Sequence, residues 1–230
     1  MVSQLIDALG RPLPRVRLEA YRPQVGSDLE MVVNYFWNIE LSEALYPCLQ
    51  TYEVALRNSI HIALTKRFEN EFWFDTNILL DWQRETLEEA KNQLTTYKKP
   101  LEAGRLVAEL NFGFWSSMFN RPYEEPLWHA DGAHLINVTF PNLPRTLRTR
   151  KKISERVERI RRLRNRVFHY EPIWNKTDLQ ERHRQIHEAL SWISPEMRDV
   201  MALCDRFDSV FCSKPTIEAK LLEHLEATGN

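Results

Sequence analysis

The stretch LYPCLQTYEVALRNSIHIALTKRF, Leu45–Phe68, carries an apolar side chain at every third or fourth position. An α-helix has about 3.6 residues per turn, so side chains at this spacing lie on one face. The stretch therefore predicts a long amphipathic helix that ends near Phe68, although Pro47 is expected to interrupt it or to begin a new turn. The repeating positions are Leu49, Tyr52, Leu56, Ile60, Ala63 and Leu64.

Composition agrees with a helical fold. Of the 230 residues, 43 % are hydrophobic and 11 % aromatic, and only six are glycines. A disordered chain would have fewer apolar residues, and an all-β chain would need more turn residues. No segment alternates convincingly between apolar and polar residues as a strand would. We therefore predict an all-α protein whose length suits one large domain.

Further helices follow from local signals. Ser27 and Glu30 have the spacing of a capping box, which begins the first buried helix. Periodicity and helix propensity predict later helices, followed by a shorter segment after Pro195. Their ranges are 81–99, 100–119, 151–170 and 176–192. Aromatic residues at Trp37, Phe114, Trp115 and Trp192 are most simply core residues.

Proline marks two regions that we expect to be irregular. Residues 1–26 contain Pro12, Pro14 and Pro23, and they are predicted to form an extended lead-in. Four of the twelve prolines fall between Asn120 and Arg145, so 120–145 is predicted to be a loop insertion on the surface. Residues 27–230 would then form a single helical domain.

Cysteine usage and hydropathy indicate the compartment. Cys48, Cys204 and Cys212 are widely spaced and form no CxxC pair, which argues against a disulfide framework or a structural zinc site. The N-terminus has no charged region followed by an apolar run, and no window approaches the ~18 apolar residues of a membrane span. We expect a cytoplasmic protein without a membrane partner.

A basic segment runs from Arg145 to Arg166. It holds eleven lysines and arginines against two glutamates, a local charge of 11 − 2 = +9. Such a concentration attracts the phosphates of a nucleic acid. The alternative is a solvated basic face with no ligand.

Arg164 occupies an unusual position on the helix predicted over 151–170. At 100° per residue, one arc of this helix contains its apolar side chains, and Arg164 lies inside that arc. A partly withdrawn arginine needs a carboxylate, a phosphate or a subunit boundary. A buried ion pair, for example with Glu53, is the structural alternative. The apolar residues of the arc are Ile153, Val157, Ile160, Leu163 and Val167.

The same helix is expected to end beside a histidine. Pro172 disfavours a helical conformation at Glu171, so the helix should stop near His169 or Tyr170. Asn165 and His169 are four residues apart and share one face. An arginine and a histidine at this distance often meet by chance, so the spacing alone is weak.

Three segments in order, YEVALRNSIH (52–61), ELNFGFWSSMF (109–119) and RNRVFHYEPIW (164–174), resemble the Abi-like (abortive infection) family of the HEPN superfamily. The resemblance covers about residues 30–195. It implies an all-α HEPN-type bundle, a homodimer that brings two such motifs together, and metal-independent RNA cleavage as in many members. It also implies a toxin-like role in defence against phage. Some members of the superfamily have lost catalysis or act as adaptors.

The superfamily's signature is an arginine, a polar residue and a histidine, which Arg164, Asn165 and His169 match. RNA carries its own nucleophile, the 2′-hydroxyl, so no metal or other cofactor is required. His169 is expected to act as acid or base, and Arg164 to stabilise charge on the phosphoryl oxygens. Asn165 is expected to orient one of these groups. Candidate substrate-binding residues are Tyr170, Arg161 and Arg166.

Glu53, Arg57 and His61 form a stripe at successive i, i+4 positions. We interpret Glu53 and Arg57 as supporting residues that brace the catalytic helix, or as a surface ion pair. For Tyr170, packing in the core is an equal alternative to contact with substrate. His183 and His187 have metal-ligand spacing, but no third ligand is evident, so no metal site is predicted.

The expected partners are RNA and a second copy of the chain, and an antitoxin or regulatory partner is left open. A catalytically silent module of the same fold, which binds RNA or protein, is the main alternative function. A metal-dependent nuclease is a third alternative, although the sequence has no compact acidic motif for it.

Overall fold

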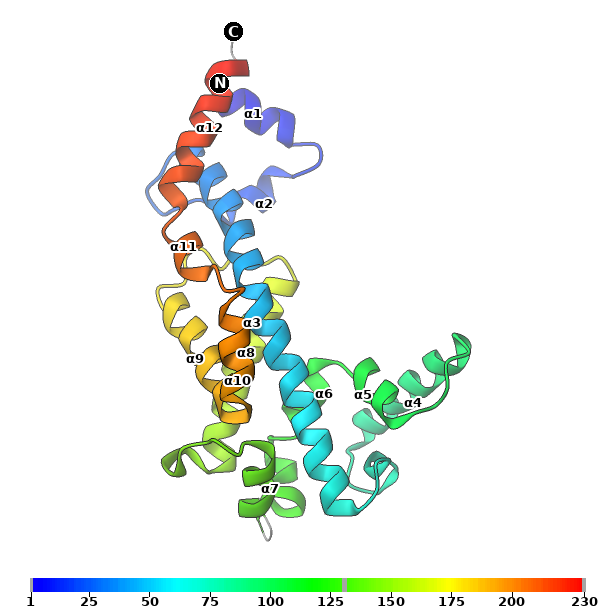
Figure 1. Cartoon of the computed structure of the whole chain (residues 1–230). Helices are drawn as coiled ribbons and strands as arrows, with labels where there is room; N and C mark the ends of the chain where they lie inside the picture. Colours follow the sequence, from blue (N-terminus) through cyan, green and yellow to red (C-terminus); the bar gives the residue numbers. More distant parts are fainter. Residues whose placement is uncertain (1, 130–131, 229–230) are drawn as a thin grey trace. The chain divides into compact units, whose positions relative to one another are not determined.

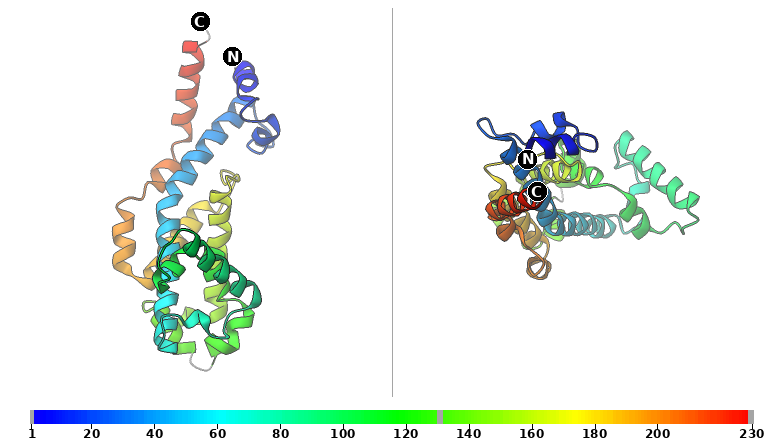
Figure 2. Two further views of the ribbon diagram at one scale, coloured as in Figure 1. Left: turned by 90° about the vertical axis from the view of Figure 1, so that its right-hand side faces the viewer. Right: turned by 90° about the horizontal axis from the view of Figure 1, so that it is seen from above.

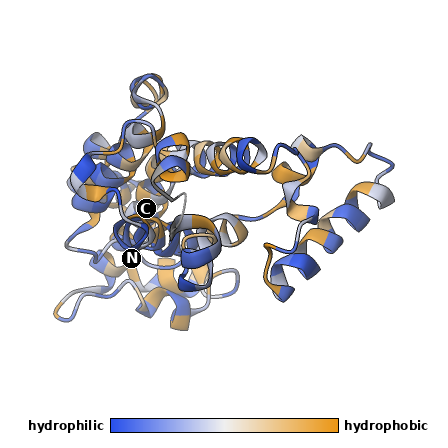
Figure 3. Cartoon of the chain, turned by 90° about the horizontal axis from the view of Figure 1, so that it is seen from below, coloured by the Kyte–Doolittle hydropathy of each residue, from blue (hydrophilic) through white to orange (hydrophobic). Residues whose placement is uncertain are grey.

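The computed structural model describes residues 2–129 and 132–228, which are largely helical and contain no β-strand in these ranges (Figure 1). The prediction of an all-α chain is confirmed for this part. Hydrophobic and hydrophilic residues occur on the same helices throughout (Figure 3), as amphipathic packing requires. The longest helices are α3 (Asp28–Phe68), α4 (Asp81–Thr96), α8 (Arg150–Phe168), α9 (Leu179–Ile193) and α12 (Lys214–Thr228).

The chain divides into two compact units, and each is described by itself. Unit 1 comprises Met1–Cys48, Leu163–His183 and Cys204–Asn230, and unit 2 comprises Leu49–Arg162 and Arg184–Leu203. The helices α3, α8 and α9 each contribute residues to both units. The expectation of a single domain over 27–230 stays a prediction.

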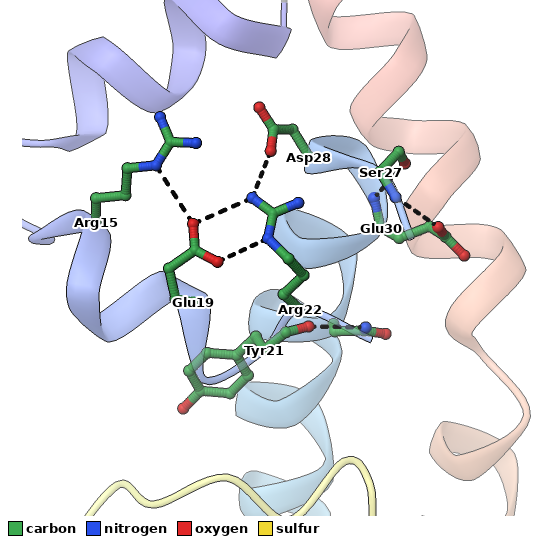
Figure 4. Close-up of polar contacts among 8 residues, drawn as sticks. Arg15, Glu19, Tyr21, Arg22, Ser27, Asp28 and Glu30 are labelled. Carbon is green, nitrogen blue, oxygen red and sulfur yellow. Dashed lines mark hydrogen bonds and ion pairs between the residues drawn. The ribbon is translucent and has the colours of Figure 1, made fainter. Parts of the chain in front are cut away.

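The capping box at the start of α3 is confirmed. The backbone N–H of Ser27 donates to Glu30 Oε2 at 2.9 Å, and the N–H of Glu30 donates to Ser27 Oγ at 3.2 Å (Figure 4). The helix then continues unbroken to Phe68, where the periodicity predicted its end (Figures 1 and 2). The expected interruption at Pro47 is wrong. The missing hydrogen bond costs stability, but burial of the flanking apolar residues offsets it. These residues are Ala44, Leu45, Cys48 and Leu49.

The prediction of an extended lead-in over 1–26 is also wrong. Residues Val2–Leu9 form α1 and Arg15–Glu19 form α2. Pro14 lies just before α2, where a helix has no N–H bond to lose. These helices bury apolar side chains, and Leu221 of α12 packs against the same cluster. The buried residues of the cluster are Ile6, Leu18, Tyr21, Met31 and Val32.

An ion-pair network fastens α2 to the start of α3 within unit 1. Arg22 pairs with Glu19 at 2.7 Å and with Asp28 at 2.5 Å (Figure 4). Hydrogen bonding by Arg22 lowers the pKa of the Glu19 carboxyl, even though burial opposes this shift. The proline-containing segment between Arg22 and Asp28 is therefore held in place by its two ends.

Short helices occupy most of the described part of 120–145, where we expected a loop insertion. This region contains η2 (Arg121–Tyr123), η3 (Glu124–His129), α7 (Gly132–Thr139) and η4 (Arg145–Leu147). Aromatic side chains between the prolines explain the difference, because they are buried and hold short helical turns against unit 2. Trp128, for example, stacks on Phe119 at 4.9 Å and donates from Nε1 to the Met118 carbonyl at 2.7 Å.

Unit 2 has a core that is rich in aromatic side chains. Trp73 and Trp115 meet edge to face at 6.2 Å, and both are fully buried. The helix predicted over 100–119 is split into α5 (Ala103–Glu109) and α6 (Phe112–Ser117), because Asn111 Oδ1 caps α6. Unit 2 also contains η1 (Trp73–Asp75) and α10 (Pro195–Ala202), and unit 1 contains α11 (Phe207–Phe211). The four aromatic core residues predicted from the sequence, Trp37, Phe114, Trp115 and Trp192, are buried.

Candidate functional site

Helix α8 presents its predicted arc to the interior. All five apolar residues of the arc are buried. Arg164, which shares the arc, is only half-buried, and its guanidinium lies over the Phe168 ring at 4.2 Å from the centroid. The two residues are four apart, so they meet on one helix face. A cation–π contact offsets part of the cost of withdrawing the charge from water, so an aromatic ring holds the guanidinium in place.

The C-terminus of α8 has a regular cap. The N–H of Tyr170 donates to the Val167 carbonyl at 3.2 Å, and the N–H of Glu171 donates to the Arg166 carbonyl at 2.8 Å. This is the Schellman pattern, which satisfies the last carbonyls of a helix. It places Tyr170 in the left-handed region with φ of 58°. The predicted helix end beside His169 is confirmed, and His169 is the last residue before the strained position.

We expect Tyr170→Gly to stabilise unit 1 by up to about 1 kcal/mol, because glycine adopts a left-handed conformation without the steric cost of a Cβ. Tyr170→Val should destabilise it by about 1–2 kcal/mol, because a β-branched residue is disfavoured there. Urea unfolding of the two variants and the wild type measures both changes. Equal destabilisation by glycine and valine would show that the tyrosine ring, and not its backbone, governs stability here.

The segment that follows α8 is anchored by residues distant in the sequence. Arg17 donates from Nη2 to the Tyr170 carbonyl at 3.1 Å. Asn38 Oδ1 accepts from the N–H groups of Ile173 at 2.7 Å and Trp174 at 3.1 Å. Neither anchoring residue is predicted from the sequence. Asn38 did leave a signal, because an asparagine within the apolar run of α3 must find a partner when it is buried.

Asn165 lies in the last turn of α8, and His169 follows directly after the helix. The His169 side chain is exposed, and Asn165 is half-buried. Among the described residues no group is hydrogen-bonded to the His169 side chain, so its ring nitrogens can meet a ligand. Five residues along an α-helix correspond to about 140° of rotation, so Arg164 and His169 of one chain point in different directions.

A cavity of about 720 Å³ lies in unit 1 beside the end of α8. Val167, Phe168 and Tyr170 line it from α8 and its cap. The Tyr170 side chain is 75 % exposed, so the alternative that it packs in the core is wrong. The Phe168 ring stacks on the Tyr46 ring with centroids 5.5 Å apart. The same Phe168 ring contacts the Arg164 guanidinium, so Arg164 lies against a residue of the cavity wall.

Two of the predicted substrate-binding arginines make internal contacts. Arg166 pairs with Glu171 at 3.4 Å and donates to the Pro172 carbonyl at 3.2 Å, so it braces the cap in unit 1. Arg161, in unit 2, makes a bidentate pair with Glu158 at 2.7 and 2.9 Å. Hydrogen bonding by Arg161 lowers the pKa of the Glu158 carboxyl. A role of Arg161 and Arg166 in substrate binding stays a prediction, because each already has an acceptor within its own unit.

Most other basic side chains of the segment 145–166 also make internal contacts. In unit 2, Arg156 pairs with Glu188 at 2.6 Å and lies over the Trp192 ring at 4.8 Å. Arg150 donates to the Phe119 carbonyl at 2.8 Å, and Arg159 donates to the Gln185 side chain at 3.2 Å. The local charge of +9 thus overstates the cationic surface that is open to a polyanion.

The supporting residues Glu53 and Arg57 lie in unit 2, on the C-terminal half of α3, and both are half-buried. Arg57 donates to the Ala108 carbonyl at 3.4 Å, so its contact is with α5. His61 accepts a hydrogen bond at Nδ1 from Trp73 Nε1 at 3.0 Å. The stripe therefore braces unit 2, and a role in holding the end of α8 stays a prediction.

The His61 contact predicts a pH dependence of stability. Burial lowers the pKa of His61 below its usual value, although Glu71 opposes the shift. The unfolded chain then binds a proton at a higher pH than the folded chain, so stability falls as the pH drops below about 6.5. The slope cannot exceed about 1.4 kcal/mol per pH unit, because one histidine exchanges at most one proton. Urea unfolding at about pH 7.5 and about pH 5.5 should show a smaller loss of stability for His61→Gln than for the wild type.

The two histidines with metal-ligand spacing, His183 and His187, lie on α9. His183 is buried, stacks on Phe207 at 4.3 Å and pairs through Nε2 with Asp205 at 2.8 Å in unit 1. His187 follows one turn later on α9. Within unit 1, His183 and Asp205 each offer one ligand atom for a cation. The expectation that the protein uses no metal stays a prediction.

None of the helices in the described ranges has the length and apolar character that crossing a bilayer requires. Comparisons with protein-family models, with curated proteins and with solved structures found no match to this chain.

Proposed function

We propose that the protein is a metal-independent endoribonuclease of the HEPN kind, and that it acts as a toxin-like effector of abortive infection. The observation that carries the proposal is the end of α8. There an exposed imidazole, His169, follows a guanidinium, Arg164, that an aromatic ring holds in position. The resemblance of three ordered motifs to the Abi-like family supports the same reaction.

The proposed reaction uses the 2′-hydroxyl of RNA as nucleophile. His169 takes the proton from this hydroxyl or gives one to the leaving 5′-oxygen. Arg164 donates to the phosphoryl oxygens, where negative charge develops. Asn165, one turn before His169, orients the imidazole or the phosphate. The products would be a 2′,3′-cyclic phosphate and a free 5′-hydroxyl.

The protein would act as a homodimer in the cytoplasm. Arg164 and His169 point in different directions within one helix, so a two-fold related chain is the simplest way to bring both groups to one phosphodiester. A second chain would also supply the second imidazole that a two-proton mechanism favours. An antitoxin or regulatory partner would restrain such an enzyme.

Cleavage of total RNA in the presence of EDTA tests the reaction. We expect new ends that carry 2′,3′-cyclic phosphate, and no cleavage of an all-deoxy strand of the same sequence. Loss of activity in EDTA with recovery in Mg²⁺ would instead support a metal-dependent nuclease.

A catalytically silent module that binds RNA or protein is the second candidate. The internal contacts of the arginines on α8 favour it in part, because braced arginines suit a structural element as well as an enzyme. Salt-sensitive RNA binding without any turnover, unchanged by His169→Ala, would select this candidate.

A further inference from the structure

The cavity beside the end of α8 has the character of a ligand site. Its volume is about 720 Å³, which suits a small-molecule site, and such sites are mainly apolar with a few placed polar groups. Tyr46 and Phe168 stack within its wall, and both the Tyr46 and the Tyr170 side chains are exposed. Aromatic residues contribute much of the lining, namely Tyr21, Tyr35, Tyr46, Phe168 and Tyr170.

A buried amide adds a specific donor to this wall. Asn38 lines the cavity, and its side chain is only 3 % exposed. Its Oδ1 accepts from two backbone N–H groups, which fixes the orientation of the amide. Among the described residues no acceptor is hydrogen-bonded to Asn38 Nδ2. Nδ2 keeps some contact with solvent, so the amide N–H groups can donate to a ligand in the cavity.

The rim of the cavity carries a small positive charge. The lining contains two arginines, Arg17 and Arg206, and one carboxylate, Glu43, which gives 2 − 1 = +1. Arg206 pairs with Glu43 at 2.7 Å, and both side chains are exposed, so this pair can exchange for a bound anion. Arg17 is positioned by its bond to the Tyr170 carbonyl. The ligand should therefore combine an aromatic ring with a negative charge.

We propose that this cavity binds an unpaired nucleobase of an RNA strand, adjacent to the phosphate that the end of α8 would cleave. The base stacks on Tyr46, Phe168 or Tyr170, as single-stranded RNA does on aromatic platforms. Asn38 Nδ2 donates to a keto oxygen or ring nitrogen of the base, and Arg17 and Arg206 contact the flanking phosphate. The assignment rests on the proposed function, because His169 lies between two residues that line the cavity.

Binding measurements on uncleavable RNA test the assignment without requiring turnover. The probe is a short fluorescent oligoribonucleotide methylated at its 2′-oxygens, and the comparison probe has the same phosphates but abasic residues. We expect the wild type to prefer the first probe by at least about tenfold, and Tyr46→Ala to lose this preference. Tyr97→Ala is the matched control, because Tyr97 is an exposed tyrosine of unit 2 that does not line the cavity.

Two further variants separate contact from folding. Asn38→Asp keeps an oxygen to accept from Ile173 and Trp174 but has no N–H to donate, so it should also lose the preference for the base. Tyr170→Gly removes a ring at a position that favours glycine, so it should weaken binding in a well-folded protein. Circular dichroism on each variant checks the fold.

The outcomes distinguish the assignment from the proposed reaction. Base preference without any cleavage would overturn the reaction and keep the cavity assignment. Cleavage with wild-type affinity and base preference in Tyr46→Ala, Asn38→Asp and Tyr170→Gly would overturn the assignment alone. A fall in dimer mass for Tyr46→Ala in sedimentation, with base preference unchanged, would show that a second chain covers the cavity and would also overturn it.

Discussion

Replacing His169 by alanine should lower the rate of RNA cleavage by about 10²–10⁴-fold, the usual contribution of a positioned acid or base. The imidazole is exposed, and its removal should therefore change the free energy of unfolding by less than about 0.5 kcal/mol. Single-turnover cleavage of a labelled RNA in EDTA measures the rate, and urea unfolding measures the stability.

His134→Ala is the matched control for this prediction, because His134 is an exposed histidine on α7 in unit 2. It should cleave at the wild-type rate. Added imidazole should restore part of the activity of His169→Ala, since a free base can occupy the space that alanine leaves. Wild-type cleavage by His169→Ala would remove this residue from the reaction.

Arg164→Ala should reduce cleavage by about 10²–10³-fold, as expected when an oriented donor to the transition state is removed. Arg164→Lys should recover only part of this loss. Lysine keeps the charge, but it lacks the planar guanidinium that lies over Phe168 and that can donate two parallel hydrogen bonds. Rates at saturating RNA separate this effect from weaker binding, because a group that acts in the transition state lowers kcat.

Arg162→Ala serves as the control for Arg164, because its side chain is 73 % exposed and pairs with Glu158 on the same helix. It should leave the cleavage rate unchanged. Urea unfolding is needed for Arg164→Ala, since Arg164 is half-buried. Equal activity in the wild type and Arg164→Ala would leave the guanidinium with a structural role only.

Mixing the two inactive variants tests the proposed pairing of chains. If each site takes Arg164 from one chain and His169 from the other, a mixed dimer contains one intact site. Random exchange should then restore about a quarter of the wild-type activity. No recovery after verified exchange of subunits would show either that both groups act within the same chain or that one site needs both imidazoles.

The sequence predicted the long helices well because their signals are local. The capping box at Ser27, the apolar arc of α8 and the stop before Pro172 each depend on residues within one helix or directly beside it. The predictions for 1–26 and 120–145 are wrong because the prolines there disfavour helices less than burial of the nearby apolar residues favours them. A proline at the start of a short helix costs little, and the apolar residues nearby gain stability only from partners elsewhere in the chain.

The candidate site was likewise predictable only where its residues are close together in the sequence. Arg164, Asn165 and His169 could be selected from one short segment, as could the exposed Tyr170. Arg17, Asn38 and Tyr46 could not, because they reach the end of α8 only when segments more than a hundred residues apart pack together. The sequence also does not show which arginines on α8 make internal contacts. A charge count does not reveal which cations already have acceptors.

The contacts of Arg156 affect how variants of α8 should be interpreted. A scan that replaces these arginines one at a time, scored only by survival or by growth arrest of the host, would attribute a loss of effect to impaired recognition. The guanidinium of Arg156 joins Glu188 and Trp192 within unit 2, so a lower amount of intact protein in the cell would produce the same phenotype. Protein abundance should therefore be quantified alongside every such phenotype.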